Sequence, residues 1–275
     1  MKINTIKTKD YVTKSNLPFC DYVINPYVGC THACKYCYAS FMKRFTGHTE
    51  EWGKFIDIKL CDKSINKRRL TGKSVFLSSV TDPYNPLENK YEITRKIIEQ
   101  LVDIDCILYI STKSSLIIRD MDLLKKCNNA TVAISLNTID EKFRKDMDNA
   151  ASVNQRLDTL KHLHNNGIYT VLFISPWFPE LTDFKALIQT TRGWVNEYWF
   201  ENLNLRADYK NRVLNYISNH HPKLIELYDD IYLYGNKEYW NQKEKEFIEY
   251  CYMNKIRFIN AFNHSKLVAS KNKKS

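Results

Sequence analysis

Short apolar, β-branched runs alternate along most of the chain with stretches in which apolar residues recur at helical spacing. This alternation is typical of parallel strands joined by crossover helices. The pattern predicts strands over residues 21–25, 75–80, 106–111, 131–136, 169–175 and 198–202. It predicts helices over residues 38–45, 93–102, 117–126, 154–164, 184–191 and 208–219.

Six strand–helix units in this order predict an α/β fold, an open partial barrel rather than a closed eight-fold one. Parallel barrels carry their chemistry on the loops that follow the strands, so those loops are the places to search. We expect an N-terminal segment over residues 1–20, a barrel core over 21–206 and a C-terminal extension over 207–275 packed on the core. The extension is aromatic and helical, with a long helix over 238–254 and a final strand over 257–262.

Composition excludes some classes of protein but leaves the type of substrate open. The formal charge of +10 suits either a polyanionic substrate such as DNA or RNA, or the solvated surface of a lysine-rich chain. Charges interrupt every long apolar run, which argues against a membrane span or a secretory signal, so we expect a soluble, cytoplasmic protein. Eight cysteines are too few for a disulfide scaffold of this length.

Three of those cysteines, Cys30, Cys34 and Cys37, fall within eight residues directly after the first predicted strand. Each thiolate of such a C-x3-C-x2-C group can bind one iron of a [4Fe–4S] cluster, which leaves the fourth iron without a protein ligand. Gly29 allows a tight turn beside the cluster. A zinc site completed by His32 or a distant cysteine, and a single cysteine nucleophile, are the alternatives.

The C-x3-C-x-aromatic-C motif resembles the signature of radical S-adenosylmethionine (SAM) enzymes, in the branch that includes spore photoproduct lyase. The resemblance covers residues 21–206 and implies a partial (β/α)6 TIM-type barrel. It implies a [4Fe–4S] cluster whose open iron binds SAM, and reductive cleavage to a 5′-deoxyadenosyl radical that abstracts hydrogen from a substrate. It also implies an electron donor such as flavodoxin or ferredoxin. The substrate is a nucleic acid, a peptide or a small metabolite.

The resemblance assigns further residues to SAM, most of them at the end of a predicted strand or just beyond it, with Tyr36 inside the cysteine motif and Arg156 in the helix after the fourth strand. Tyr36 matches a position near the adenine, and Lys113 one near the carboxylate. The alternative for several of these residues is an ordinary structural role: a turn cap at Asp82, a surface side chain at Lys113 or Arg156. The remaining expected SAM contacts are Ser78, Thr81 and Asp82 at the amino group, Ser135 and Asn137 at the ribose, Arg156, and Pro176 beneath the adenine.

One position separates this chain from spore photoproduct lyase itself. Tyr38 matches a tyrosine of the lyase's hydrogen relay, but Val80 stands where the hydrogen-donating cysteine is expected. Valine cannot donate, and Cys106 or Cys127 would have to reach the site instead. We therefore expect a different substrate. A function of another kind, an iron–sulfur redox or sensor protein without SAM chemistry, would need a fourth thiolate, with Cys20 and Cys61 nearest in sequence.

Overall fold

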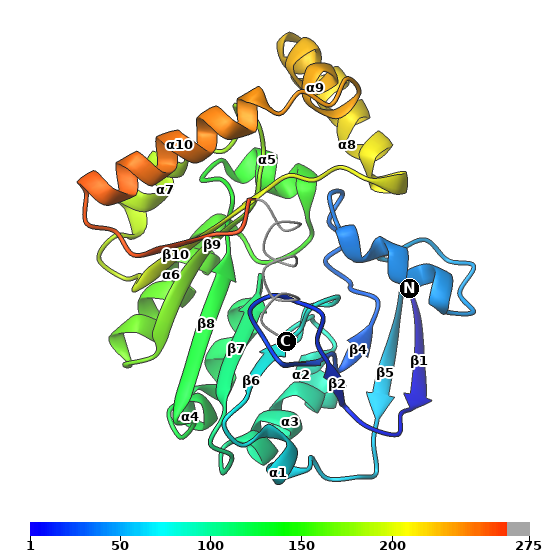
Figure 1. Cartoon of the computed structure of the whole chain (residues 1–275). Coiled ribbons are helices and arrows are strands. Elements are labelled where there is room, and N and C mark those ends of the chain that lie inside the picture. Colours follow the sequence, from blue (N-terminus) through cyan, green and yellow to red (C-terminus); the bar gives the residue numbers. More distant parts are fainter. Residues whose placement is uncertain (263–275) are drawn as a thin grey trace.

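The computed structural model describes residues 1–262, apart from the side chains of residues 207 and 208. Its main sheet has eight strands in the order β11-β10-β9-β8-β7-β6-β3-β2 (Figure 1). All neighbours pair in parallel except β2 and β3, which are antiparallel. The strands are β2 (Val12–Lys14), β3 (Tyr22–Ile24), β6 (Ser74–Leu77), β7 (Ile107–Thr112), β8 (Asn129–Ser135), β9 (Tyr169–Trp177), β10 (Glu197–Asn202) and β11 (Phe258–Asn260).

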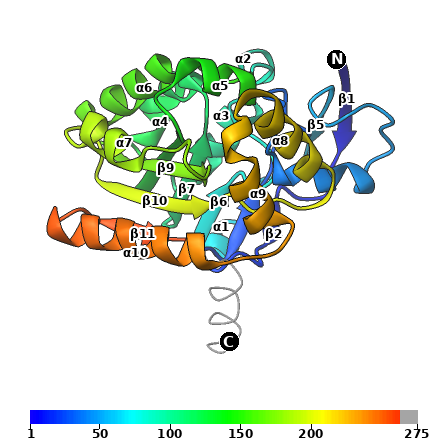
Figure 2. The same cartoon turned by 90° about the horizontal axis from the view of Figure 1, so that it is seen from above.

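Helices cover the convex face of this sheet and form the main core with it (Figure 2). Ile98 of α3, Leu160 of α6 and Leu187 of α7 are at most 1% exposed against the strands. On α10, Phe247 stacks on Phe200 of β10 with ring centroids 4.4 Å apart. The covering helices are α3 (Ile93–Leu101), α4 (Met121–Leu124), α6 (Val153–Asn165), α7 (Phe184–Thr191) and α10 (Glu238–Met253), while α1 (Lys67–Leu70) and α2 (Glu88–Tyr91) are single turns.

The other face of the sheet is concave and aromatic. Because side chains alternate along a strand, the parallel register places Phe76, Tyr109 and Thr131 side by side on this face. Two layers nearer the strands' carboxyl ends, Phe173 lies between Ser135 and Trp199. Above those ends lie α8 (Ala207–His220) and α9 (Ile225–Tyr232), with η3 (Pro222–Leu224) between them (Figure 1).

A second sheet of three strands, in the order β1-β5-β4, lies beside the barrel (Figure 1). In it, β1 (Lys2–Lys7) runs parallel to β5 (Phe55–Leu60) over six residue pairs. The short β4 (Tyr27–Val28) pairs with β5 antiparallel. This sheet therefore joins the start of the chain to the segments on either side of the cysteine motif.

The predicted open partial barrel is confirmed, and five of its six strands agree with the structure to within two residues at each end. The second strand is shorter than expected, because β6 ends at Leu77, and Val80 lies in the loop beyond it. Residues 38–45 form a 3-10 helix, η1 (Tyr38–Phe45), rather than an α-helix. The expected helix over 117–126 is the 3-10 helix η2 (Ser115–Asp120) followed by α4. The sheet β1-β5-β4, β2, α5 (Glu141–Met147) and α9 were not predicted.

Among the described helices, none has the length and apolar character needed to cross a membrane.

Candidate active site

The three cysteines lie on the loop between β4 and η1, at the carboxyl end of the first barrel strand. Cys30 and Cys34 are each 8% exposed, and Cys37 is half-buried. Cys30 packs with Trp52 and Phe55, whereas Cys34 packs with Tyr36 against α8. Cys37 packs against both of these groups, so the loop holds its three thiols between two apolar surroundings.

A turn before β5 supports this loop from behind. Gly53 has φ of +94°, and a β-carbon there would lie 2.6 Å from the β-carbon of Ala33 in the cysteine loop. Gly29 has φ of +88°, and its added β-carbon would meet the Phe55 carbonyl oxygen at 2.5 Å. Only glycine fits either position, because both the backbone conformation and the close approach exclude a side chain.

Burial dominates the ionisation of the thiols. It raises the pKa of Cys30 well above its usual value, that of Cys34 to about 12, and that of Cys37 as well. The Lys113 ammonium opposes this rise in pKa at Cys34 and Cys37. The metal-free thiols are therefore protonated at neutral pH, and binding iron must release protons.

Several buried polar atoms around the loop have no hydrogen-bond partner within residues 1–262: Thr31 Oγ1, His32 Nδ1, Trp52 Nε1 and Ser78 Oγ. Buried polar atoms are nearly always paired, so their gathering here suits a group that binds at this place. In the described part of the chain, no three Cys, His, Asp or Glu side chains converge on one metal ion. A cubane cluster needs no single point of convergence, because each of three thiolates binds a separate iron.

Asp82 connects the cysteine loop to the neighbouring strand. Its carboxylate accepts hydrogen bonds from the Thr112 hydroxyl at 2.7 Å, the Lys113 amide at 2.8 Å and the Tyr84 amide at 2.9 Å. The Nε2 atom of His32, inside the cysteine motif, lies 3.2 Å from the same carboxylate. Burial alone would raise the pKa of Asp82, but His32 and these donors outweigh it and lower the pKa to about 2.

Tyr36 and Arg156 meet at a carboxylate that sequence reasoning missed. The Tyr36 hydroxyl donates to Asp148 at 3.0 Å, and Arg156 Nη2 donates to the other Asp148 oxygen at 2.6 Å. Arg156 also donates to the carbonyls of Ser135 and Ala151. It is 1% exposed, so the alternative of a surface arginine is wrong. An acidic residue shortly before a helix is too common to have marked Asp148.

Lys113 differs from these paired groups. Its ammonium lies 5.8 Å from the centre of the Tyr36 ring, and it forms no ion pair or side-chain hydrogen bond with any residue up to 262. Its charge helps lower the pKa of the buried Asp148 below its usual value, although burial opposes this and Arg156 contributes more. The Lys113 ammonium thus lies beside the cysteine loop, and no carboxylate of residues 1–262 is directly paired with it.

The remaining expected residues line the same mouth of the barrel. Thr81 donates to the Gly29 carbonyl at 2.6 Å, which ties the loop after β6 to the cysteine loop. Asn137, buried after β8, donates to the carbonyl of Pro176 at 3.0 Å, and the Ser175–Pro176 peptide is cis. Ser78 and Ser135 are 5% and 4% exposed.

Tyr38 and Val80 both contribute to the contact between the cysteine segment and the loop after β6. Tyr38 is 52% exposed and its hydroxyl donates to the Ser79 carbonyl, while Val80 packs against the apolar group around Cys30. Cys106 is buried in the convex core and Cys127 packs against it, so neither thiol faces the mouth. Neither cysteine therefore takes the place of the missing hydrogen donor.

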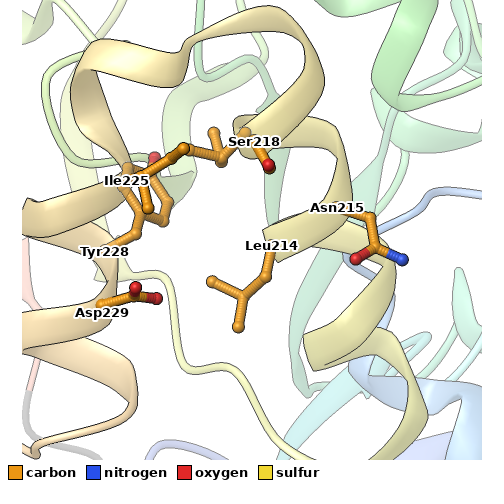
Figure 3. Close-up of a pocket in the computed structure, with 7 residues that line it drawn as sticks. Leu214, Asn215, Ser218, Ile225, Tyr228 and Asp229 are labelled. Atoms are coloured by element: carbon orange, nitrogen blue, oxygen red, sulfur yellow. The ribbon is translucent and has the colours of Figure 1, made fainter.

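A separate pocket lies between α8 and α9, lined by Leu214, Ser218, Ile225, Tyr228 and Asp229 among others (Figure 3). The Tyr228 hydroxyl is bonded to the Pro179 carbonyl. The lining includes none of the cysteines or expected SAM contacts. This pocket is a gap between two packed helices rather than part of the site described above.

Comparison with known proteins agrees with this geometry. Residues 24–189 match the family model of the radical SAM superfamily. A protein of Methanocaldococcus jannaschii (MJ0683) is 36% identical over 228 residues, covering 82% of this chain and 86% of that protein. A protein of Pseudomonas phage M6, a radical SAM Nalpha-GlyT isomerase, is 28% identical over 158 residues, covering 56% of this chain and 32% of that protein.

A solved structure of spore photoproduct lyase complexed with dinucleoside spore photoproduct has the same fold, with a TM-score of 0.59 at 17% identity. The alignment covers 80% of this chain and 66% of the lyase. The cysteine loop, the open parallel barrel and the match over more than half of the sequence lead to one conclusion: the chain is an enzyme that belongs to the radical SAM superfamily.

Proposed function

We propose that this enzyme cleaves SAM reductively at a [4Fe–4S] cluster held by Cys30, Cys34 and Cys37. Bound together, cluster and SAM supply a 5′-deoxyadenosyl radical that removes hydrogen from a substrate. The observation that carries the proposal is the loop of three thiols surrounded by buried polar atoms that have no partner within residues 1–262. A donor of the flavodoxin or ferredoxin class would provide the electron.

The chain's own residues would hold SAM in the mouth of the barrel. The Lys113 ammonium is suited to the carboxylate, because it has no anionic partner bound directly within the described chain. Tyr36 offers a ring fixed by Asp148 and by an edge contact to Phe178 at 5.5 Å. Asn137, Ser135 and Pro176 close the side nearest β8 and β9, where we place the ribose and adenine.

Asp82 and Arg156 would act chiefly as positioning residues. The oxygens of Asp82 already accept protein donors, and all three guanidinium nitrogens of Arg156 already donate. A direct contact of either with SAM would add to these bonds. Ser78 is better placed for direct contact, since its buried hydroxyl has no partner among the described residues.

A redox or sensor protein with four cysteine ligands is the second candidate, and the structure offers it little support. Cys20 precedes β3, whereas the cysteine loop follows that strand; its thiol donates to Ser15 at 3.1 Å. Cys61 follows β5, whose first residue, Phe55, packs on Cys30. The six residues of β5 place Cys61 about 20 Å from Phe55 along the strand. Neither thiol packs with the three cysteines.

For the substrate we propose a nucleic acid ahead of a peptide or small metabolite. Residues 22–49 contain no Asp or Glu, and η1 exposes Tyr38, Phe41 and Phe45 beside Arg44, whose guanidinium lies 4.7 Å from the Phe45 ring. Exposed rings with adjacent cations suit stacked bases and phosphates. The comparison lyase is complexed with a dinucleoside, which is consistent with this class. Val80 argues against the lyase reaction itself.

The test is anaerobic reconstitution with iron and sulfide, followed by SAM and a strong reductant. We expect 5′-deoxyadenosine and methionine, and a change in the electron paramagnetic resonance (EPR) spectrum of the reduced cluster when SAM is added. A cluster that assembles but gives neither product nor spectral change would overturn the proposal in favour of the redox protein. Affinity for single-stranded DNA or RNA that does not weaken with salt would count against the nucleic acid.

A further inference from the structure

Trp52 is buried beside the cysteine loop without a conventional partner for its indole N–H. The side chain is 7% exposed, and Nε1 makes no hydrogen bond within the described residues. Leaving a buried donor unpaired is destabilising. Such an atom therefore needs an explanation in a well-packed part of the protein.

Two cysteines of the motif lie in the apolar group that surrounds the indole. Trp52 packs with Cys30, Ala39 and Phe55, and Cys37 lies against the same group. A neutral thiol is a weak acceptor, whereas a thiolate bound to iron accepts N–H donors well.

The indole is held in this orientation by the small sheet. Its ring meets Phe55 edge-to-face, with centroids 5.7 Å apart, and Phe55 stacks on His48 at 3.9 Å. His48 is fixed in turn by Asp57 of β5, 2.8 Å from its Nε2 atom. On the other side, a β-carbon built on Gly53 would lie 2.6 Å from that of Ala33, so the turn packs closely against the cysteine loop.

We propose that Trp52 is a positioning residue that tunes the cluster: its indole N–H donates to Cys37 Sγ once that sulfur ligates iron, and so raises the reduction potential. This inference rests on the proposed function, because it requires the cluster. Reduction adds one electron from the donor and increases negative charge on the sulfurs. A fixed N–H dipole therefore stabilises the reduced cluster more than the oxidised one.

The test compares Trp52→Phe with wild type in a redox titration of the reconstituted cluster, followed by EPR. Phenylalanine keeps a ring but removes the donor. We expect a more negative midpoint at unchanged iron content, so that at the wild-type midpoint less than half of the variant's clusters are reduced. Trp194→Phe is the matched control. Trp194 lies near the amino-terminal end of β10 against Lys161, and its variant should retain the wild-type midpoint.

A second measurement does not depend on whether Trp52→Phe folds. In wild type carrying 15N-labelled tryptophan, pulsed EPR of the reduced cluster should detect coupling to an indole nitrogen, and Trp194→Phe should retain it. An unshifted midpoint in Trp52→Phe, or no 15N coupling in wild type, would overturn the inference. Both results presuppose an assembled cluster. Failure of wild type to assemble one, or to cleave SAM with it, counts instead against the proposed function.

Discussion

The Nη2 atom of Arg156 lies 2.6 Å from Oδ1 of Asp148, and each side chain is only 1% exposed. The second Asp148 oxygen accepts the hydroxyl of Tyr36, which stands between Cys34 and Cys37. A buried ion pair thus links α6 to the cysteine motif. Because the motif and the helix are far apart in sequence, this contact fixes the cysteine loop to the opposite part of the barrel mouth.

Asp148→Asn should destabilise the metal-free protein strongly. It leaves the Arg156 charge buried without its counter-charge, and breaking such a pair costs about 3–5 kcal/mol. Urea unfolding followed by circular dichroism measures the loss. Asp103→Asn is the control, since Asp103 and its partner Lys67 are 73% and 61% exposed and should matter little. Equal stability of the two variants would contradict the argument.

Acid should destabilise the fold through Asp82. Its pKa is lowered from 3.8 to about 2, so the folded state binds its proton less readily than the unfolded chain does. The resulting stability is fully present above about pH 4 and is lost as the pH falls through the folded pKa. Thermal unfolding between pH 5 and pH 2 should show a smaller dependence on pH in Asp82→Asn. A slope equal to that of wild type would argue against the shift.

Cluster assembly should depend on three cysteines and no others in the described chain. Single replacements of Cys30, Cys34 or Cys37 by Ala should reduce bound iron and sulfide to background, because each thiolate holds its own iron. Cys61→Ala should retain both, since it lies at the far end of β5. Iron and sulfide analysis after reconstitution decides between three and four required cysteines.

Lys113→Met should weaken SAM binding while leaving the cluster intact. Losing a hydrogen bond between charged groups costs about 1.5–3 kcal/mol, which corresponds to roughly a 10- to 100-fold loss of affinity. Titrating SAM into the reduced cluster by EPR measures the change. Lys67→Met on α1 provides the control. An affinity unchanged in Lys113→Met would place the SAM carboxylate elsewhere.

Gly53→Ala should damage the cysteine loop more than backbone strain alone explains. At Gly167, with φ of +81° and no neighbour within 4 Å of an added β-carbon, alanine should cost about 1–2 kcal/mol. At Gly53 the new β-carbon also collides with Ala33. We expect a larger loss of stability and lower iron content than in Gly167→Ala. Matching values for the two variants would show that the turn does not support the loop.

The sequence was sufficient for features encoded locally. Apolar periodicity predicted the barrel strands because each is a buried run bounded by polar residues, and α7 was predicted over its exact residues. The sheet β1-β5-β4 was missed because Lys2–Lys7 is largely exposed, and its partner strand begins more than 50 residues later. Apolar spacing also cannot distinguish the 3-10 geometry of η1 from an α-helix.

The site likewise contains residues that local sequence marks and residues that only tertiary contacts mark. The spacing of the cysteines singled out the metal-binding loop, and the ends of the predicted strands directed attention to Lys113 and Asn137. Asp148 and Trp52 were not found, because what marks them is contact with Tyr36, 112 residues away from Asp148, and with Cys37 from a separate turn. Pairings of this kind exist only after the chain has folded.

The pairing of β1 with β5 has a thermodynamic consequence. Ile3 and Ile56 are held in register, and the whole cysteine motif lies in the chain between them. The entropy of closing that loop is lost when the small sheet forms, before any iron is present. The entropic cost of closing this loop is therefore already met in the metal-free protein. Iron binding does not have to offset it, which favours assembly of the cluster.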